Sequence, residues 1–119
     1  MTYALLIYDD DSTWTNLPES ERAALRAAEM PKWVALFEEL GKADPNVSGK
    51  ELDGRSTAKV VRVRDGERIV TDGPFADTKE VVGGIFVTEL PDLDEAIRLA
   101  ALIPAAAGTG AIEIRPVLQ

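Results

Sequence analysis

The sequence predicts one α+β domain spanning residues 1–119, with a ferredoxin-like arrangement of strands and helices. A chain of 119 residues is of ordinary size for a single domain. Hydrophobic residues make up 45% of the chain and charged residues 29%, a composition typical of globular proteins with a core. The apolar patterns give the order β-α-β-β-β-β-α-β, and removing the central hairpin leaves the split β-α-β unit of ferredoxin-like folds.

The first strand and the first helix follow from two different apolar patterns. Tyr3–Tyr8 is a short apolar run that stops at three aspartates, which predicts a buried strand. From Pro18 to Leu40 apolar side chains recur every three or four residues, which predicts a helix. Its expected apolar stripe consists of Ala23, Ala27, Met30, Val34 and Phe37, widened by Trp33 and Leu40.

The ends of this helix carry capping signals. Asn16 with Glu19 three residues later resembles a capping box, and Gly41 suits the position just after the helix. Pro31 removes one backbone donor inside the pattern, so we expect it to kink the helix or to divide it in two.

A β-hairpin is predicted in the middle of the chain. Val47–Leu52 reads as a weak edge strand. Thr57–Arg64 and Glu67–Thr71 then flank Asp65-Gly66, a strong signal for a two-residue hairpin turn.

The last third of the chain repeats the strand–helix–strand pattern. Ile85–Leu90 reads as a strand, and Asp92 with Glu95 forms a capping box for a second helix that Pro104 stops. Ala111–Arg115 alternates apolar and charged residues, which predicts a final strand with one buried face.

Two helices can cover only one face of such a sheet. A second copy of the same sheet is the simplest cover for the other face, so we expect a homodimer.

Charge and residue usage exclude several classes of function. Asp and Glu outnumber Lys and Arg by 21 to 13, and the net charge of −8 disfavours direct binding to nucleic acid. The chain contains no cysteine and no histidine, so it lacks the usual neutral-pH acid/base and the commonest metal ligands. It also lacks an apolar run of membrane-spanning length, a secretory signal, and dinucleotide or P-loop motifs. We therefore expect a cytoplasmic protein with no membrane contact, no metal and no cofactor.

One segment closely resembles a known family. Asp72-Gly73-Pro74-Phe75 is followed by Thr78-Lys79-Glu80 and then by Gly83-Gly84. This succession is similar to the DGPF branch of the YCII-related proteins, and the resemblance extends over nearly the whole chain.

The resemblance implies a dimeric α+β barrel, in which two ferredoxin-like subunits pack sheet to sheet and a small-molecule cavity lies between the sheet and the helices. It also implies a bacterial protein of unassigned function, from a family often encoded beside sigma factors. Some YCII-related proteins are proposed to use a His-Asp pair as acid and base, but this chain has no histidine. Two functions stay open: an acid/base enzyme acting on an unknown small molecule, or a non-catalytic module that binds a ligand or a transcription-related protein.

The segment itself supplies the catalytic candidates. Asp72, Lys79 and Glu80 are the candidates for proton transfer or anion binding, because a lysine beside carboxylates in a partly enclosed cavity can have shifted ionisation. Pro74 and Phe75 are candidates for ligand contact. Their structural alternative is a fixed turn at Pro74 followed by a Phe75 ring that plugs the core.

Further ligand candidates lie at strand ends. Tyr8 can donate a hydrogen bond and Arg115 can hold a carboxylate; the alternative is a rim aromatic and an interface salt bridge. Asp9 follows the first strand directly and can face the cavity mouth. The run Asp9-Asp10-Asp11 otherwise reads as a solvated loop, because its spacing does not match a calcium-binding loop.

Overall fold

A computed structural model of the chain describes residues 1–119, except for the side chain of Thr13. The strands and the two longer helices follow the expected order, with three short helices added between them. In chain order the elements are β1 (Thr2–Asp9), α1 (Ser12–Thr15), α2 (Glu19–Ala43), β2 (Ser48–Glu51), the 3₁₀ helix η1 (Arg55–Thr57), β3 (Lys59–Arg64), β4 (Glu67–Asp72), β5 (Val81–Glu89), α3 (Leu93–Ala100), α4 (Pro104–Ala107) and β6 (Ala111–Pro116).

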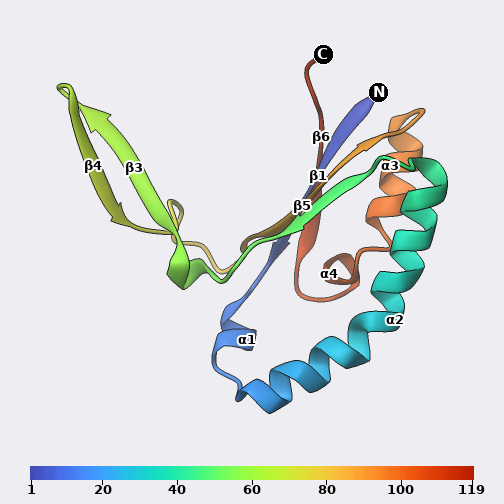
Figure 1. The fold of residues 1–119 in the computed structure, drawn as a ribbon, viewed down its shortest axis with the longest axis horizontal. Coiled ribbons are helices and arrows are strands. Elements are labelled where there is room, and N and C mark those ends of the chain that lie inside the picture. Colours follow the sequence, from blue (N-terminus) through green and yellow to red (C-terminus); the bar gives the residue numbers. More distant parts are fainter.

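Four of the strands form one antiparallel sheet in the order β2-β5-β1-β6. With α2 connecting β1 to β2, and α3 and α4 connecting β5 to β6, this order is consistent with a ferredoxin-like fold. The helices α2, α3 and α4 all lie on one side of the sheet (Figure 1). The α+β class and the one-sided helices are therefore confirmed. The sheet is open, with β2 and β6 as its edges, so the described part of one chain does not close into a barrel.

The predicted hairpin forms as a separate two-stranded sheet of β3 and β4. Asp65 has φ 51° and Gly66 has φ 76°. Both values lie in the left-handed region that a tight two-residue hairpin turn requires, and for which aspartate followed by glycine is favoured. The hairpin projects away from the main sheet and its helices (Figure 1).

The core fills the space between the sheet and the helices. Alternate residues of β1 and β5 point into it, and Leu5 is fully buried there. Gly49 of the edge strand β2 lies against the Phe86 ring, since a Cβ atom at Gly49 would sit 2.5 Å from Phe86 Cε1. The buried core residues are Tyr3, Leu5, Leu36, Leu40, Phe86, Leu90, Ala96, Leu99 and Ile103.

The ends of α2 differ from the prediction. The helix begins at Glu19 after Pro18, with no side-chain cap, so the capping box of Asn16 with Glu19 does not form. The reason is that Asn16 instead ends the preceding turn of helix, where its N–H donates to a carbonyl of α1. At the other end the helix runs on past Gly41, and the N–H of Asp44 bonds to the Leu40 carbonyl.

The buried side of α2 also differs from the prediction. The helix is continuous through Pro31, and its axis bends along its length (Figure 1). Met30, Val34 and Phe37 of the expected stripe are half-exposed, whereas Leu40 is buried as expected and Leu36, outside the stripe, is buried as well. Only the C-terminal half of α2 covers the sheet, because the N-terminal half runs past it.

Within the described residues no helix is long and apolar enough to cross a membrane.

The second long helix confirms its predicted start. The N–H of Glu95 donates to Asp92 Oδ1 at 2.9 Å, which caps α3. The helix ends at Ala100, before Pro104, and Pro104 begins α4 instead of stopping α3. Proline suits the first turn of a helix because its missing N–H has no helical partner there.

A buried carboxylate ties the start of β2 to the end of β5. Asp44 accepts hydrogen bonds from the backbone N–H groups of Asn46 and Glu89 and from the Thr88 hydroxyl. The Glu89 N–H is the largest of the causes that hold the pKa of Asp44 below its ordinary value, and burial opposes it. Asp44 is therefore an ionised, fully engaged structural acceptor at neutral pH.

Candidate functional site

The face of the sheet turned away from the helices, called the open face below, brings apolar side chains together. Ala4 and Leu6 of β1 lie opposite Val87 and Ile85 of β5. Residues directly opposite in an antiparallel pair share a face, and these alternate with the buried Leu5. The centre of the open face is therefore an apolar floor built from two central strands.

A polar group stands beside this floor on β1 and β6. The Tyr8 hydroxyl donates to Glu113 Oε1 at 3.2 Å. Burial raises the pKa of Tyr8, the Glu113 carboxylate raises it further, and the charge of Arg115 acts in the opposite direction. Arg115 lies two residues beyond Glu113, so both project to the open face, where Leu6 lies opposite Glu113. This rim cluster, Tyr8, Glu113 and Arg115, offers a protonated hydroxyl, a carboxylate and a guanidinium next to an apolar surface.

A second polar group is centred on Arg55 of η1. The Asp11 carboxylate accepts from both the backbone N–H and the Nε of Arg55. The terminal nitrogens of Arg55 donate to the carbonyl of Thr78 at 2.7 Å and to that of Lys79 at 2.6 Å. The side chains of Arg55 and Asp11 are each 23% exposed. Because its donors are directed at protein groups, Arg55 acts as a clamp that holds the segment before β5 to the exit of β1.

Asp10 joins the same clamp. Its Oδ1 accepts from the backbone N–H and the hydroxyl of Ser12, and Arg55 NH2 lies 3.5 Å away. The Ser12 hydroxyl is the largest cause that lowers the pKa of Asp10; the Ser12 N–H adds to it, as do the charges of Arg55 and Lys79, while burial opposes them. Asp10 is buried and ionised, so the interpretation of the aspartate run as a solvated loop is wrong for Asp10 and for the clamped Asp11.

Asp9, at the end of β1, contacts a different segment from Asp10 and Asp11. Its Oδ1 accepts from the Thr109 hydroxyl at 2.8 Å and from the N–H of Asp10 at 2.9 Å. The bond from Thr109 ties the end of β1 to the loop that leads into β6. Among the residues that the structure describes, no group of three or more histidine, cysteine, aspartate or glutamate side chains is arranged to hold a metal ion.

The DGPF segment begins at the base of the projecting hairpin. Asp72 forms an ion pair with Lys59 across β3 and β4, and both side chains are largely exposed. Asp72 is therefore paired with a side chain of the neighbouring strand β3. Gly73 closes the base, where its N–H donates to the Ala58 carbonyl at 2.8 Å and a Cβ atom would lie 2.9 Å from Ala58 Cβ.

Phe75 does not plug the core, and that prediction is wrong. Its side chain is 78% exposed, and the guanidinium carbon of Arg62 lies 5.3 Å from its ring centroid. The Gly73–Pro74 peptide preceding it is cis. The physical reason for the exposed position is that the segment leaves from β4, which belongs to the hairpin and not to the core. Phe75 therefore lies beside Arg62 of β3 and not beneath the main sheet.

Lys79 and Glu80 contribute backbone groups to the clamp region. The Lys79 carbonyl accepts from Arg55, and the Glu80 carbonyl accepts from the Thr78 hydroxyl at 2.7 Å. Residues 79 and 80 form a bend, and none of the described residues from Asp77 to Glu80 is helical. The Thr78 and Lys79 carbonyls accept hydrogen bonds from the Arg55 side chain and not from N–H groups of a helical turn.

The structure thus separates the candidates, with Lys79 and Glu80 in the clamp region and the others in two further places. Pairing of β1 with β6 brings Tyr8 near Arg115, whereas Asp72 and Phe75 lie on or beside the hairpin. Glu113 was missed, although the alternation of β6 places it on the same face as Arg115. Arg55 was also missed, and no pattern around it signals that it binds two segments distant in sequence.

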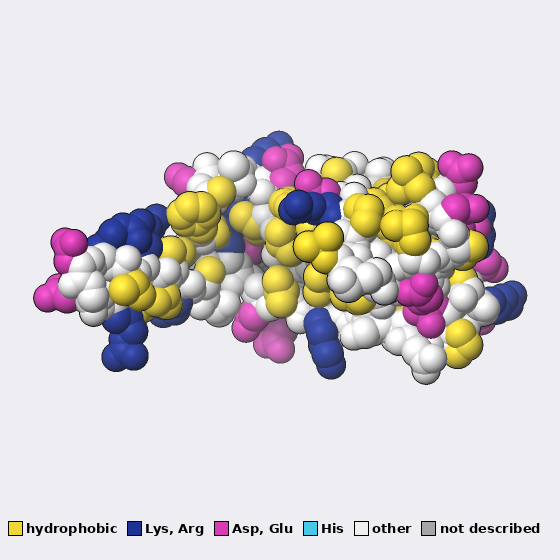
Figure 2. All heavy atoms as spheres, turned by 90° about the horizontal axis from the view of Figure 1, so that it is seen from above, with side chains coloured by type: hydrophobic (Ala, Val, Ile, Leu, Met, Phe, Trp, Pro, Cys, Tyr) yellow, Lys and Arg dark blue, Asp and Glu magenta, His cyan; other side chains and the backbone are white. Residues whose placement is uncertain are grey.

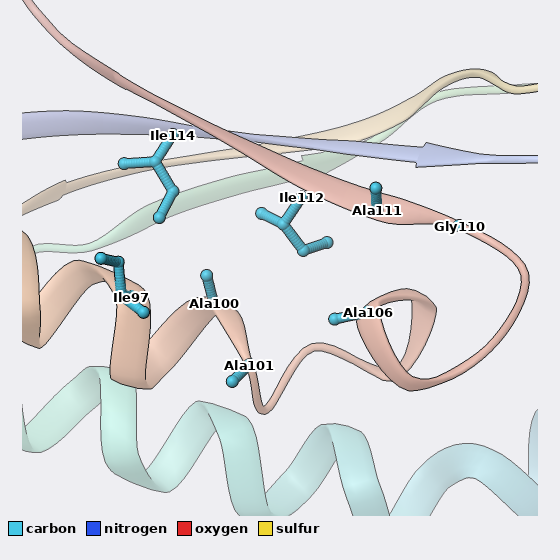
Figure 3. Close-up of a pocket in the computed structure, with 8 residues that line it drawn as sticks. All are labelled: Ile97, Ala100, Ala101, Ala106, Gly110, Ala111, Ile112 and Ile114. Carbon is cyan, nitrogen blue, oxygen red and sulfur yellow. The ribbon is translucent and has the colours of Figure 1, made fainter.

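Two hollows lie on the helical side of the molecule. A groove of about 410 Å³ opens between β6 and the helices α3 and α4, with isoleucine and alanine side chains pointing into it (Figure 3). It is lined by Ile97, Ala100, Ala101, Ala106, Gly110, Ala111, Ile112 and Ile114. A second hollow of about 600 Å³ lies between α2 and the α3–α4 region. Neither is lined by a predicted site residue, so the candidates lie outside both hollows.

Comparison with known proteins places the chain in a family. The YCII-related domain family matches residues 1–119. An uncharacterised protein of Rhizobium meliloti (strain 1021) is 37% identical over 122 residues, which cover 98% of this chain and 91% of that protein. With the whole chain matched by the domain and by this relative, the chain belongs to the YCII-related family.

Proposed function

We propose that this chain is a homodimeric binding protein for a small organic acid, which it holds on the open face of the sheet. The observation that carries the proposal is the rim cluster beside the apolar floor. Tyr8, hydrogen-bonded to Glu113, and Arg115 stand at the border of a surface made of Ala4 and Leu6 with their β5 neighbours.

The chemistry of the rim cluster suits a carboxylate with an apolar tail. A guanidinium binds a carboxylate through charge-assisted hydrogen bonds, and a protonated phenol adds a neutral donor. The raised pKa of Tyr8 keeps its hydroxyl protonated at neutral pH. The floor of Ala4, Leu6 and Ile85 offers no polar side chain, so it favours an apolar body over a polar one.

The exposed area supports the dimer. The chain exposes 8176 Å², whereas a folded monomer of 12.9 kDa exposes about 6,300 Å². The excess of roughly 1,900 Å² is more than the ~800 Å² that each partner buries in a standard interface. Packing two open faces together covers apolar surface and encloses the rim clusters, which strengthens their electrostatic contacts.

The described carboxylates whose pKa is shifted serve as structural acceptors outside the rim cluster. The pKa values of Asp10 and Asp44 are lowered by hydrogen bonds, and that of Glu89 is lowered first by its bond with the N-terminal amino group. These carboxylates are ionised at neutral pH, whereas a general acid or base works best with a pKa near the operating pH. Tyr8 with Glu113 is the pair on which an enzymatic role would rest.

Calorimetric titration with acetate, hexanoate and benzoate tests the proposal. Hexanoate and benzoate are expected to bind more tightly than acetate, because only they reach the apolar floor. Arg115→Gln is expected to weaken binding about ten- to a hundredfold, the effect of losing a hydrogen bond to a charged group. Tyr8→Phe is expected to weaken it less, because it removes a neutral donor.

The matched control is Arg22→Gln, which removes the same charge from the exposed N-terminal half of α2. It is expected to leave carboxylate affinity unchanged. Equal binding by wild type and Arg115→Gln would refute the site. An absence of binding by all three acids would favour the protein-interaction role that the family resemblance implies.

A further inference from the structure

The hairpin Lys59–Asp72, called the arm below, stands outside the body of the molecule (Figure 1). The radius of gyration of the chain is 16.3 Å, against about 13.5 Å for a compact domain of this length. Strands β3 and β4 pack mainly against each other and form a sheet of their own. The arm therefore has no core beneath it within its own chain.

The two faces of the arm are unequal. On one face Val61 lies opposite Val70, and Val63 follows on the same side. These valines are 59%, 56% and 61% exposed, respectively. On the other face the guanidinium of Arg62 is covered by the Phe75 ring. The valine face is thus bare, while the opposite face is partly covered by the DGPF segment.

A bare two-stranded ribbon is unfavourable in water. An isolated hairpin is at best marginally stable, and a third strand or a packed surface is needed to hold it. Exposed valines on a free ribbon also favour unwanted association through strand edges. The arm is therefore expected to have a covering surface in the working protein.

The exposed area and the charge both point to a second copy as that surface. The excess of roughly 1,900 Å² exceeds what a sheet-to-sheet contact of ~800 Å² per partner would remove. The arm carries four basic and three acidic residues, whereas the rest of the chain carries nine basic and eighteen acidic ones. Basic side chains gather on the projecting arm, with hydrophobic ones between them (Figure 2). On the valine face itself Arg68 lies opposite Val63, so a basic side chain stands beside the valines and complements a body of net charge −9.

We propose that the valine face of each arm packs against the acidic body of a second copy, so that two arms clasp the dimer. This inference rests on the homodimer proposed above and adds the arm contact to it. The arm lies on the side of the sheet away from α2, α3 and α4, where a copy stacked on the open face would stand (Figure 1). In a two-fold dimer the same contact forms twice.

Hydrogen–deuterium exchange of the intact protein, combined with analytical ultracentrifugation, tests the clasp. Amides of Val60–Val70 are expected to be protected at concentrations where the protein is dimeric. Their exchange is expected to accelerate at least about tenfold on dilution to the monomer, because the free ribbon opens readily.

Two variants separate the faces of the arm. Val61→Glu places a charge on the bare face and is expected to raise the dimer dissociation constant about tenfold or more, since a buried valine is lost at each of two contacts. Ile69→Glu places the same charge in the same hairpin but on the opposite face, beside Arg62, and is expected to leave the dissociation constant near that of wild type.

The outcomes distinguish the clasp from the proposed function. A dimer whose arm amides exchange freely, or whose stability Val61→Glu does not change, would overturn the clasp and leave the dimer and its ligand site intact. A protein that stays monomeric at all concentrations would overturn the clasp together with the dimer. Loss of carboxylate binding by Arg115→Gln is measured separately and does not depend on the arm.

Discussion

Arg55 offers the sharpest test of how this fold is held together. The change Arg55→Met keeps a long side chain but removes all of its side-chain donors. It breaks three close contacts, that of Nε with Asp11 and the bonds to the Thr78 and Lys79 carbonyls, and also the longer contact of NH2 with Asp10 Oδ1 at 3.5 Å. The backbone N–H of residue 55 still reaches Asp11, so that carboxylate keeps one of its partners.

The expected loss of stability follows from these three contacts. A net hydrogen bond contributes about 1 kcal/mol, and one to a charged group contributes about 1.5–3 kcal/mol. All three involve the guanidinium, but the Arg55 and Asp11 side chains are each 23% exposed, and solvent screening reduces their contribution. We therefore expect Arg55→Met to lower the free energy of unfolding by about 3 kcal/mol in total.

Urea unfolding followed by circular dichroism measures this loss, and the melting temperature is expected to fall by roughly 12 °C. Arg64→Met is the matched control, because Arg64 is exposed near the tip of the arm and donates to the adjacent Val63 carbonyl. Its cost is expected to stay within about 0.5 kcal/mol. If Arg55→Met costs no more than Arg64→Met, the clamp does not hold the DGPF segment to the exit of β1.

Two further outcomes are expected. Gly110→Ala should destabilise the protein by at least about 2 kcal/mol, because its Cβ would lie 2.0 Å from the Tyr8 carbonyl oxygen. Gly41→Ala in α2 meets no described atom within 4 Å and should stabilise the protein by about 0.5–1 kcal/mol. Thermal unfolding of both variants checks these two values. The lowered pKa of Asp44 means that its contribution to stability is complete above its ordinary value of 3.8 and is lost as the pH falls through the lower folded pKa. Urea midpoints between pH 7 and pH 2 should therefore fall in the acid range, and less steeply in Asp44→Asn; equal slopes would contradict the assignment.

The sequence by itself determined the features that depend on neighbouring residues. The turn at Asp65-Gly66 needs two left-handed residues in succession, and that requirement is local. The cap of α3 by Asp92 is set by a spacing of three residues. The alternation in β6 determined which of its side chains face the core, because strand periodicity fixes the two faces.

Only the tertiary structure decided the contacts between distant segments. The side chain of Arg55 binds Asp11, 44 positions away, and the carbonyls after the DGPF turn; nothing near Arg55 in the sequence signals either partner. Phe75 looks like a core residue by type, but it lies beside an arm that leaves the body, so no core is within its reach.

The same division applies to α2 and to the candidate site. Helical spacing predicted that α2 exists, but both sides of it carry apolar residues, and the position of the sheet decided that Leu36 rather than Phe37 is buried. Strand pairing brought Tyr8 to Glu113 across 105 positions. Local preferences act over a few residues and can be read along the chain, whereas burial and partner choice depend on which surfaces meet after folding.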